Sequence, residues 1–500
     1  MPFRKMMSRH RGAAVAAAGA VLAVTVSPAL AGQGAGRSAA GCDVGRTAVA
    51  HFANGVVLRP QPAGAPVPCS VTTGYGGAET RIVVTNDNTV VYEPATLAPG
   101  VAGLAYAAGA PGPHLQSSLN PGGLAVTGNM GSTWRFVKPS GLTWVPQDDQ
   151  LYVDRNTGRI FYYALSPNPF PQGGDVPAQD QLPAGYAHLM ASPDDGASWS
   201  HTSLVGFVES ENPRFATAPP PSGQARPVNY PDVAYWCGNN MLFAETYREC
   251  YRSLDGGITW TQASTLFSQP VPQHPECGTS AENFNAGDGN YPEAGPGGSL
   301  YVLVSCGANT FLAKSTDEGA TWPIIKDKAG APLQIPPTDE LRVDGRGDLF
   351  AVHLVGANQL LLRISRDGGL SWSAPLDMTA PGVTSINEWF MAERGPSVVV
   401  SYLGQKVGQA NWDGYLTVTR DALAARPVFW SATVNNPRTP MYVGTPAPAR
   451  DDFIGADIGP DGTPWGSFFA SCPANATDPA CAGQSSDPQA NAAVAGHLAW

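Results

Sequence analysis

Acidic residues recur in this chain at one fixed distance before a series of tight turns, and they are its first candidates for chemistry. Asp149, Asp232, Asp339 and Glu388 stand at this register, and Glu293, Glu340 and Asp452 lie near it. Two of the stretches, NYPD and NYPE, also place Tyr230 and Tyr291 two residues before the acid. Such side chains suit sugar hydroxyls or a cation, and crowded carboxylates raise one another's pKa values, which can create a general acid.

The same recurrence allows a structural interpretation. If these acids open the innermost strands of a ring of sheets, each carboxylate can cap backbone N–H groups. It can also bind water at the rim of the central channel. Catalytic residues are usually unique, so a position that repeats in most units favours this structural role over repeated catalysis.

An eight-residue turn motif indicates which elements position these side chains. Four copies fit SxDxGxxW, namely SPDDGASW from Ser192, SLDGGITW from Ser253, STDEGATW from Ser315 and SRDGGLSW from Ser365, and TGNMGSTW from Thr127 is a close variant. The Asp accepts hydrogen bonds from backbone N–H groups of the turn, the Gly supplies a left-handed backbone and the Trp begins the next strand with a large buried area. The residues expected to play this structural role are Asp194, Asp255, Asp317, Asp367, Trp199, Trp260, Trp322 and Trp372.

A second repeated element, a tight turn followed by an apolar strand, precedes these motifs. The runs begin at Asn86, Val153, Trp236, Gly295, Val343, Ala392 and Gly459. Together the two elements make a four-stranded unit of roughly 50 to 65 residues, and no such unit can bury its faces alone. We therefore predict an all-β fold, a β-propeller of four-stranded blades. Seven blades are favoured, and six are possible because the unit near Arg426 lacks the turn glycine.

The N-terminus reads as a secretory signal peptide over residues 1–31. Basic residues precede an apolar run from Ala13 to Val26, and the Ala-Leu-Ala at 29–31 matches a cleavage site. A lipoprotein-like AAGC that ends at Cys42 is a weaker alternative. We expect a secreted, extracellular protein with no membrane span. The segment 32–79 is expected to supply the strand that closes the ring, within Arg46 to Leu58, and residues 80–500 the propeller.

Eight cysteines in an exported chain favour disulfides over metal ligands. The pairs closest in sequence are Cys42 with Cys69, Cys237 with Cys250, Cys277 with Cys306 and Cys472 with Cys481. No spacing resembles a zinc site, so we expect neither a metal nor a cofactor.

Net charge excludes one class of partner. The chain has 29 Lys and Arg against 40 Asp and Glu, a formal charge of −11. The signal peptide contains four Lys and Arg and no Asp or Glu, so its removal makes the chain more acidic. Because no basic stripe remains to meet a phosphate backbone, we expect no nucleic acid partner. We expect a monomer that binds a glycan or another cell-surface or extracellular ligand.

The four SxDxGxxW turns resemble the Asp boxes, or BNR repeats, of the sialidase-like β-propeller superfamily. For the sialidases of that family, the resemblance implies three arginines that hold a carboxylate, a Tyr nucleophile with a Glu partner and an Asp acid/base. Arg81 and Ile82 match the register of the first arginine motif, although Val83 stands where the family has Pro. Arg342 and Arg450 are the candidates for the other two arginines, and no Tyr stands in the context of the family nucleophile.

Two hypotheses follow for the ligand site, which propellers usually place under long loops at a channel mouth. The first is a sialidase-like glycosidase. Its candidate catalytic residues are Arg81, Asp149, Asp232, Glu293, Glu388 and Asp452, and its candidate substrate-binding residues are Tyr230, Tyr291, Arg342 and Arg450. The second is a propeller that binds a carbohydrate or a protein without turnover. A fold of this kind hosts many functions, so it does not decide between them.

Overall fold

The computed structural model describes most of the chain after residue 40. The described residues are 41–76, 80–94, 123–140, 149–164, 187–204, 213–224, 229–239, 248–267, 274–277, 282–283, 292–307, 309–436, 438–444, 454–472, 475, 481 and 491–500. The signal peptide expected at 1–31 lies outside them, as do Tyr291, Arg450 and Asp452. The described part holds two complete short 3-10 turns, η2 (Pro275–Cys277) and η4 (Pro296–Gly298).

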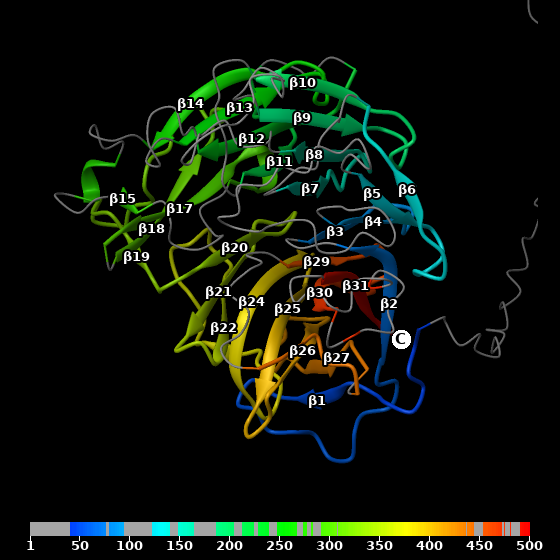
Figure 1. Ribbon diagram of the computed structural model, residues 1–500. Helices are drawn as coiled ribbons and strands as arrows, with labels where there is room; N and C mark the ends of the chain where they lie inside the picture. Colours follow the sequence, from blue (N-terminus) through cyan, green and yellow to red (C-terminus); the bar gives the residue numbers. More distant parts are fainter. Residues whose placement is uncertain are drawn as a thin grey trace, which may run out of the picture. The chain divides into compact units, whose positions relative to one another are not determined.

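The strands form seven sheets of four or more strands, which we number as blades in chain order (Figure 1). Blade 1 holds β3 (Arg81–Val84), β4 (Val90–Glu93), β5 (Leu124–Thr127) and β6 (Arg135–Val137). Blade 2 holds β7 (Gln150–Val153), β8 (Ile160–Ala164), β9 (Ala187–Ser192) and β10 (Ser200–Leu204). Blade 3 holds β11 (Arg214–Ala218), β12 (Val233–Asn239), β13 (Arg248–Ser253) and β14 (Thr261–Phe267). Blade 4 holds β15 (Glu282–Asn283), β16 (Glu293–Ala294), β17 (Leu300–Cys306), β18 (Asn309–Ser315) and β19 (Gln334–Ile335).

The last two of the remaining three blades include strands from the N-terminal segment. Blade 5 holds β20 (Glu340–Val343), β21 (Leu349–Val355), β22 (Gln359–Ser365) and β23 (Leu376–Asp377). Blade 6 holds β24 (Val383–Arg394), β25 (Ser397–Lys406), β26 (Asn411–Thr419), β27 (Phe429–Thr433), β28 (Tyr442–Val443) and β1 (Val49–His51). Blade 7 holds β29 (Gly455–Ile458), β30 (Pro464–Ser471), β31 (Asn491–Ala499) and β2 (Val67–Gly76).

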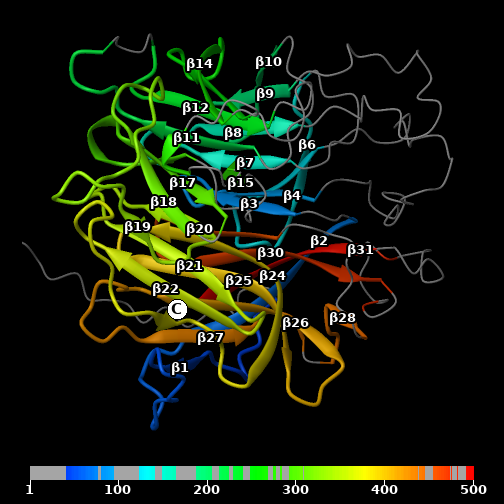
Figure 2. The same ribbon diagram turned by 90° about the vertical axis from the view of Figure 1, so that its left-hand side faces the viewer.

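The blades close into a ring, which confirms the predicted seven-bladed propeller. The innermost strands contact one another in cyclic order, β3, β7, β11, β16, β20, β24, β29 and again β3. Figure 1 shows most of these strands toward the centre, with later strands of the blades farther out, and Figure 2 shows the sheets from the side. Seven separate clusters of buried apolar side chains join the blades in pairs, and one of them joins blade 7 to blade 1.

Strand alternation explains how each blade serves two of these cores. Successive side chains of a strand point to opposite faces of its sheet. In β8, Phe161 and Tyr163 pack toward blade 3, whereas Ile160 and Tyr162 pack toward blade 1. Each face is therefore apolar, and a single blade would leave both faces in water.

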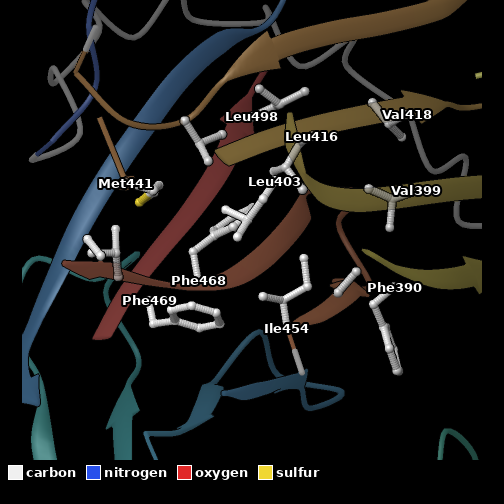
Figure 3. Close-up of a cluster of buried hydrophobic side chains, with 14 of the residues drawn as sticks. Phe390, Val399, Leu403, Leu416, Val418, Met441, Ile454, Phe468, Phe469 and Leu498 are labelled. Carbon is white, nitrogen blue, oxygen red and sulfur yellow. The ribbon is translucent and has the colours of Figure 1, made fainter. Parts of the chain in front are cut away.

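The core between blades 6 and 7 shows the packing in detail (Figure 3). Leu403 and Leu416 of blade 6 lie with Phe468 and Phe469 of blade 7, and all four side chains are fully buried. Burying a side chain of this size contributes about 1.5–3 kcal/mol. Phe390, on the innermost strand β24, extends this core to the centre of the ring.

The ring is closed by β2, the outer strand of blade 7. Antiparallel pairs run from Val67 with Ala499 to Thr72 with Val494. We expected the closing strand within Arg46–Leu58, and that location is wrong. Residues 49–51 of that stretch form β1, which instead adds to the outer edge of blade 6 through His51 and Phe429.

The repeated turns lie between the third and fourth strands of blades 1 to 5. In the turn from Ser253, Asp255 Oδ1 accepts hydrogen bonds from the Ser253 hydroxyl at 2.8 Å and from the Thr259 N–H at 2.9 Å. The Ser253 hydroxyl accepts from the Gly257 N–H at 2.8 Å. The turns that hold Asp194, Asp317 and Asp367 repeat this pattern, and Asn129 replaces the acid in the first.

The strand that we predicted to be innermost in blade 3 is its second strand. The run from Trp236 belongs to β12, the second strand of its blade, and β11 is the innermost. β11 was missed because a proline-rich loop separates it from β12.

The eight cysteines are joined in the four pairs that sequence proximity favoured, Cys42–Cys69, Cys237–Cys250, Cys277–Cys306 and Cys472–Cys481. Cys237 and Cys250 face each other directly across β12 and β13. Across the described residues, no helix is both long and apolar enough to cross a membrane.

Candidate functional site

Three arginines from three blades surround one aromatic ring at the centre of the propeller. The guanidinium carbons of Arg81, Arg214 and Arg342 lie 5.3, 4.5 and 5.1 Å from the centre of the Phe390 ring. All four residues are at least nine-tenths buried. A cation within about 6 Å of a ring centre is attracted to its face. We call these residues, with Glu293 and Glu340, the arginine cluster.

Two carboxylates partly neutralise the arginine cluster. Arg342 Nη1 donates to Glu293 Oε1 at 2.9 Å, and its Nη2 donates to Glu340 Oε1. The same oxygen of Glu340 lies 3.7 Å from Arg214 Nη2. Burial raises the pKa of Glu293, although Arg342 and Arg214 oppose that rise. Two carboxylates therefore lie among the three guanidinium groups, and Glu93 stands opposite Arg81 on the neighbouring strand.

Backbone contacts fix where these side chains stand. Arg81 Nη1 donates to the Ile454 carbonyl at 2.7 Å, and Glu340 Oε2 accepts from the Met391 N–H at 2.7 Å. Gly455 allows β29 to approach β3, because a Cβ there would lie 2.9 Å from Ile82 N and 3.2 Å from Arg81 Cα. The cluster is thus built by contacts between blades rather than by one loop.

A second group of polar residues lies where the innermost strands end. We call Arg155, Glu393, Arg394 and Asp457 the exit cluster. Arg155, in the turn after β7, donates to Asp457 Oδ1 at 2.7 Å, to the Glu393 carbonyl at 3.1 Å and to the Ile458 carbonyl at 3.2 Å. Arg394 also donates to the Ile458 carbonyl, at 2.9 Å. Arg155 therefore ties blade 2 to blades 6 and 7 across the centre.

Glu393 contributes a carboxyl group with unusual acidity to the exit cluster. Its Oε2 is buried, with no hydrogen-bond partner among the described residues. Burial raises the pKa of Glu393 to about 8, because the attraction of Arg155 does not offset desolvation and the repulsion of Glu293 and Asp344. This carboxyl is protonated at neutral pH.

The structure brings together three of the residues that the sequence proposed for the site. Arg81, Glu293 and Arg342 all belong to the arginine cluster. Arg450, the expected third arginine, lies outside the described residues, and Arg214 is the third guanidinium beside Phe390. Arg214 was missed with its strand, and RFATA, a short run that opens with an arginine, was its only signal.

The other proposed residues lie apart from this cluster or have structural partners. Asp149 is buried and accepts a hydrogen bond from the Tyr162 hydroxyl. Glu388 lies at a bulge in β24 with a φ of +41°, two residues before Phe390, and accepts from Asn387 Nδ2 at 3.0 Å.

Tyr230 and Asp232 both contact the turn that follows β7, which holds Asp154 and Asn156. The Tyr230 hydroxyl donates to Asp154 Oδ2, and Asn156 Nδ2 donates to Asp232 Oδ2 at 2.9 Å. Asp232 precedes β12, so our expectation that it opens an innermost strand is wrong. Burial raises the pKa of Asp232 to about 6, with a further contribution from Asp154.

No family model matches the chain, and no curated protein matches it either. Solved structures similar to it include a protein of unknown function from Dyadobacter fermentans, at 14% identity over 86% of this chain and 97% of that one, with a TM-score of 0.40. An α-L-arabinanase from Penicillium chrysogenum is 12% identical over 73% and 98%, with a TM-score of 0.36. The Aleuria aurantia lectin is 11% identical over 76% and 99%, with a TM-score of 0.40. Likenesses this low say nothing about the activity of this chain.

Proposed function

We propose that this protein binds acidic carbohydrates, sugars that carry a carboxylate, outside the cell through the arginine cluster. One observation carries the proposal: Arg81, Arg214 and Arg342 reach the same aromatic ring from three different blades. Guanidinium groups bind carboxylates with charge-assisted and often bidentate hydrogen bonds. Two of the three, Arg81 and Arg342, are residues that the likeness to sialidase-like Asp-box propellers selected.

The surroundings of the cluster support a ligand of this kind. The guanidinium groups can donate hydrogen bonds to an anion, while the carboxylates of Glu293 and Glu340 can accept hydrogen bonds from sugar hydroxyls. Four disulfides support an extracellular location. The five turns with one hydrogen-bond pattern support membership of the Asp-box propellers.

A second candidate function, hydrolysis of such a sugar, is favoured by Glu393. A carboxyl that stays protonated at neutral pH is what a general acid needs. The electrostatic interactions of Glu393 with Arg342 and Glu293 place it near the arginine cluster. In this version of the proposal, the cluster holds the substrate carboxylate and Glu393 protonates the leaving oxygen.

Calorimetric titration with sialyl-lactose, a uronic-acid disaccharide and neutral lactose tests the binding proposal. We expect the acidic sugars to bind and lactose not to bind. Arg214→Ala should weaken binding by at least about tenfold, the cost of one lost charge-assisted hydrogen bond. Arg135→Ala is the matched control, because Arg135 is exposed on β6 and bonds only the Asp195 carbonyl among the described residues.

Two outcomes would reject the proposal. Equal binding of acidic and neutral sugars would show that the arginines do not select the ligand, and an unchanged affinity in Arg214→Ala would place the site elsewhere. Hydrolysis is tested separately with aryl glycosides of the acidic sugar that binds. Turnover by the wild type that Glu393→Gln abolishes, with binding retained, would support the second candidate.

A further inference from the structure

A buried histidine near the ring closure has no hydrogen-bond partner. His497 of β31 is fully buried, and neither ring nitrogen has a partner among the described residues. Its ring stacks on Trp465 of β30, with ring centres 4.2 Å apart. A buried polar group left without a hydrogen bond is costly, so this arrangement needs an explanation.

The neighbours of His497 on the other side are the two sulfur atoms of one cystine. Cys69 of β2 stands directly opposite His497, and Cys42 stands directly opposite Cys69. A ring nitrogen of His497 and the two sulfur atoms all lie within 4.8 Å of one another. We call Cys42, Cys69 and His497 the closure triad.

Backbone pairing holds the closure triad together independently of the disulfide. The Ser70 N–H donates to the Gly41 carbonyl at 2.9 Å, and the Asp43 N–H donates to the Pro68 carbonyl at 3.0 Å. These bonds flank Cys42 and Cys69, and the β2–β31 ladder positions His497. Reduction of the disulfide would therefore leave three ligand groups on adjacent backbones.

We propose that the closure triad binds a thiophilic divalent cation such as Zn²⁺ when Cys42 and Cys69 are reduced. A dithiol reductant supplies two electrons and two protons, the S–S bond breaks, two thiols form and the reductant becomes a disulfide. Metal binding then displaces both thiol protons. The two thiolates and the imidazole nitrogen supply three of four tetrahedral positions, and the fourth is left for water.

The chemistry of the triad fits such an ion. Thiolates and imidazole are preferred ligands of Zn²⁺. The ring of His497 is fully buried beside both sulfur atoms, so its nitrogen can reach an ion that the two sulfur atoms hold. Among the described residues, no other cysteine pair has a third metal-binding group this close.

The proposal gives the ring closure two mutually exclusive forms, because a sulfur atom in the disulfide cannot serve as a thiolate ligand. In both forms, residues 41–43 stay bound to β2, and through it to β31. The oxidised form is joined by a covalent bond and the reduced form by a metal ion. Metal binding would thus protect the closure in the reduced chain before its disulfide forms.

Cobalt titration of the folded protein tests the proposal, with and without prior treatment by a dithiol. The probe is Co²⁺, whose thiolate charge-transfer absorption reports sulfur ligation, and Zn²⁺ is then added to displace it. We expect one Co²⁺ per chain in the reduced protein and none in the oxidised protein. His497→Ala should weaken binding by at least about tenfold, since even loss of an outer-shell partner costs that much.

Matched cysteine variants separate this triad from the other pairs. The Cys42→Ser/Cys69→Ser variant should lose the cobalt absorption, and the Cys237→Ser/Cys250→Ser variant should keep it. His497→Ala retains every cysteine, so it remains informative if a cysteine variant fails to fold. Absence of the thiolate-to-cobalt absorption in the reduced wild type would overturn the proposal. Unfolding of the reduced wild type that added Zn²⁺ does not reverse would overturn it as well. Binding that does not depend on His497 would also overturn it.

Discussion

Arg342 Nη1 lies 2.9 Å from Glu293 Oε1 at the centre of the propeller, where the two side chains are only 11% and 22% exposed. The second nitrogen of the same guanidinium binds Glu340, so one cation contacts two carboxylates from two blades, and Arg214 lies 3.7 Å from the second of them. An ion pair in such a position costs desolvation to form, and removal of one partner leaves the other charge buried alone.

Arg342→Met should therefore destabilise the protein by about 3–5 kcal/mol, the usual cost of breaking a buried ion pair. Urea unfolding measures this loss. Adding Glu340→Gln should recover part of it, because the uncompensated charge is then removed. A loss below about 1 kcal/mol would be typical of an exposed pair and would contradict this account.

Asp255 should stabilise its turn mainly through its hydrogen bonds. Asp255→Ala loses the bonds to Ser253 and to the Thr259 N–H and hydroxyl, and should cost about 1–3 kcal/mol. Asp255→Asn should cost less, since Asn129 occupies the same position in the first turn. Thermal unfolding of both variants beside the wild type measures the difference, and equal losses would show that the hydrogen bonds contribute little.

The advantage of Asp255 over Asn should depend on pH. Burial tends to raise the pKa of Asp255, but its hydrogen bonds outweigh that effect and hold the pKa below its ordinary value. A carboxyl with a lowered pKa stabilises the fold above its unfolded pKa and loses this effect as pH falls through the folded pKa. The difference in unfolding free energy between wild type and Asp255→Asn should thus shrink in acid.

Glu393 should produce the opposite pH dependence. Its folded pKa of about 8 exceeds the unfolded value of about 4.3, so the folded state binds the extra proton and stability decreases as pH rises between these values. Glu393→Gln should match the wild type near pH 4 and exceed its stability above pH 8. Urea unfolding at several pH values tests this, and parallel curves for the two proteins would refute the raised pKa.

Gly455 should control the position of Arg81. A methyl group at this position meets the Ser467 hydroxyl at 2.7 Å and also the backbone of Ile82 and Arg81, which cannot turn aside, so Gly455→Ala should push β29 away from β3. We expect acidic-sugar affinity to fall several-fold with the fold retained. Gly345→Ala is the matched control, because its added methyl meets nothing within 4 Å. Unchanged affinity in Gly455→Ala would show that β29 can relax without moving Arg81.

Local features of the sequence were enough to predict the fold class, the blade number and the four disulfide pairs. The reason is that each repeated turn is specified by residues within eight positions, as the bonds of Ser253, Asp255 and Gly257 show. The apolar runs that follow the tight turns then predicted sheets that are buried on both faces, and the sheet of β8 is one. Cysteine pairs such as Cys237 and Cys250 lie close in sequence, so proximity along the chain sufficed.

Tertiary structure alone decided which strands close the ring and which arginines meet. Neither β1 nor β2 carries a local signal for the blade it joins, because their partners Phe429 and Ala499 lie more than 370 residues away. Arg214 joins Arg81 and Arg342 only because the ring places β3, β11 and β20 around Phe390. Such convergence depends on interblade packing over the whole chain, and sequence spacing carries no record of it.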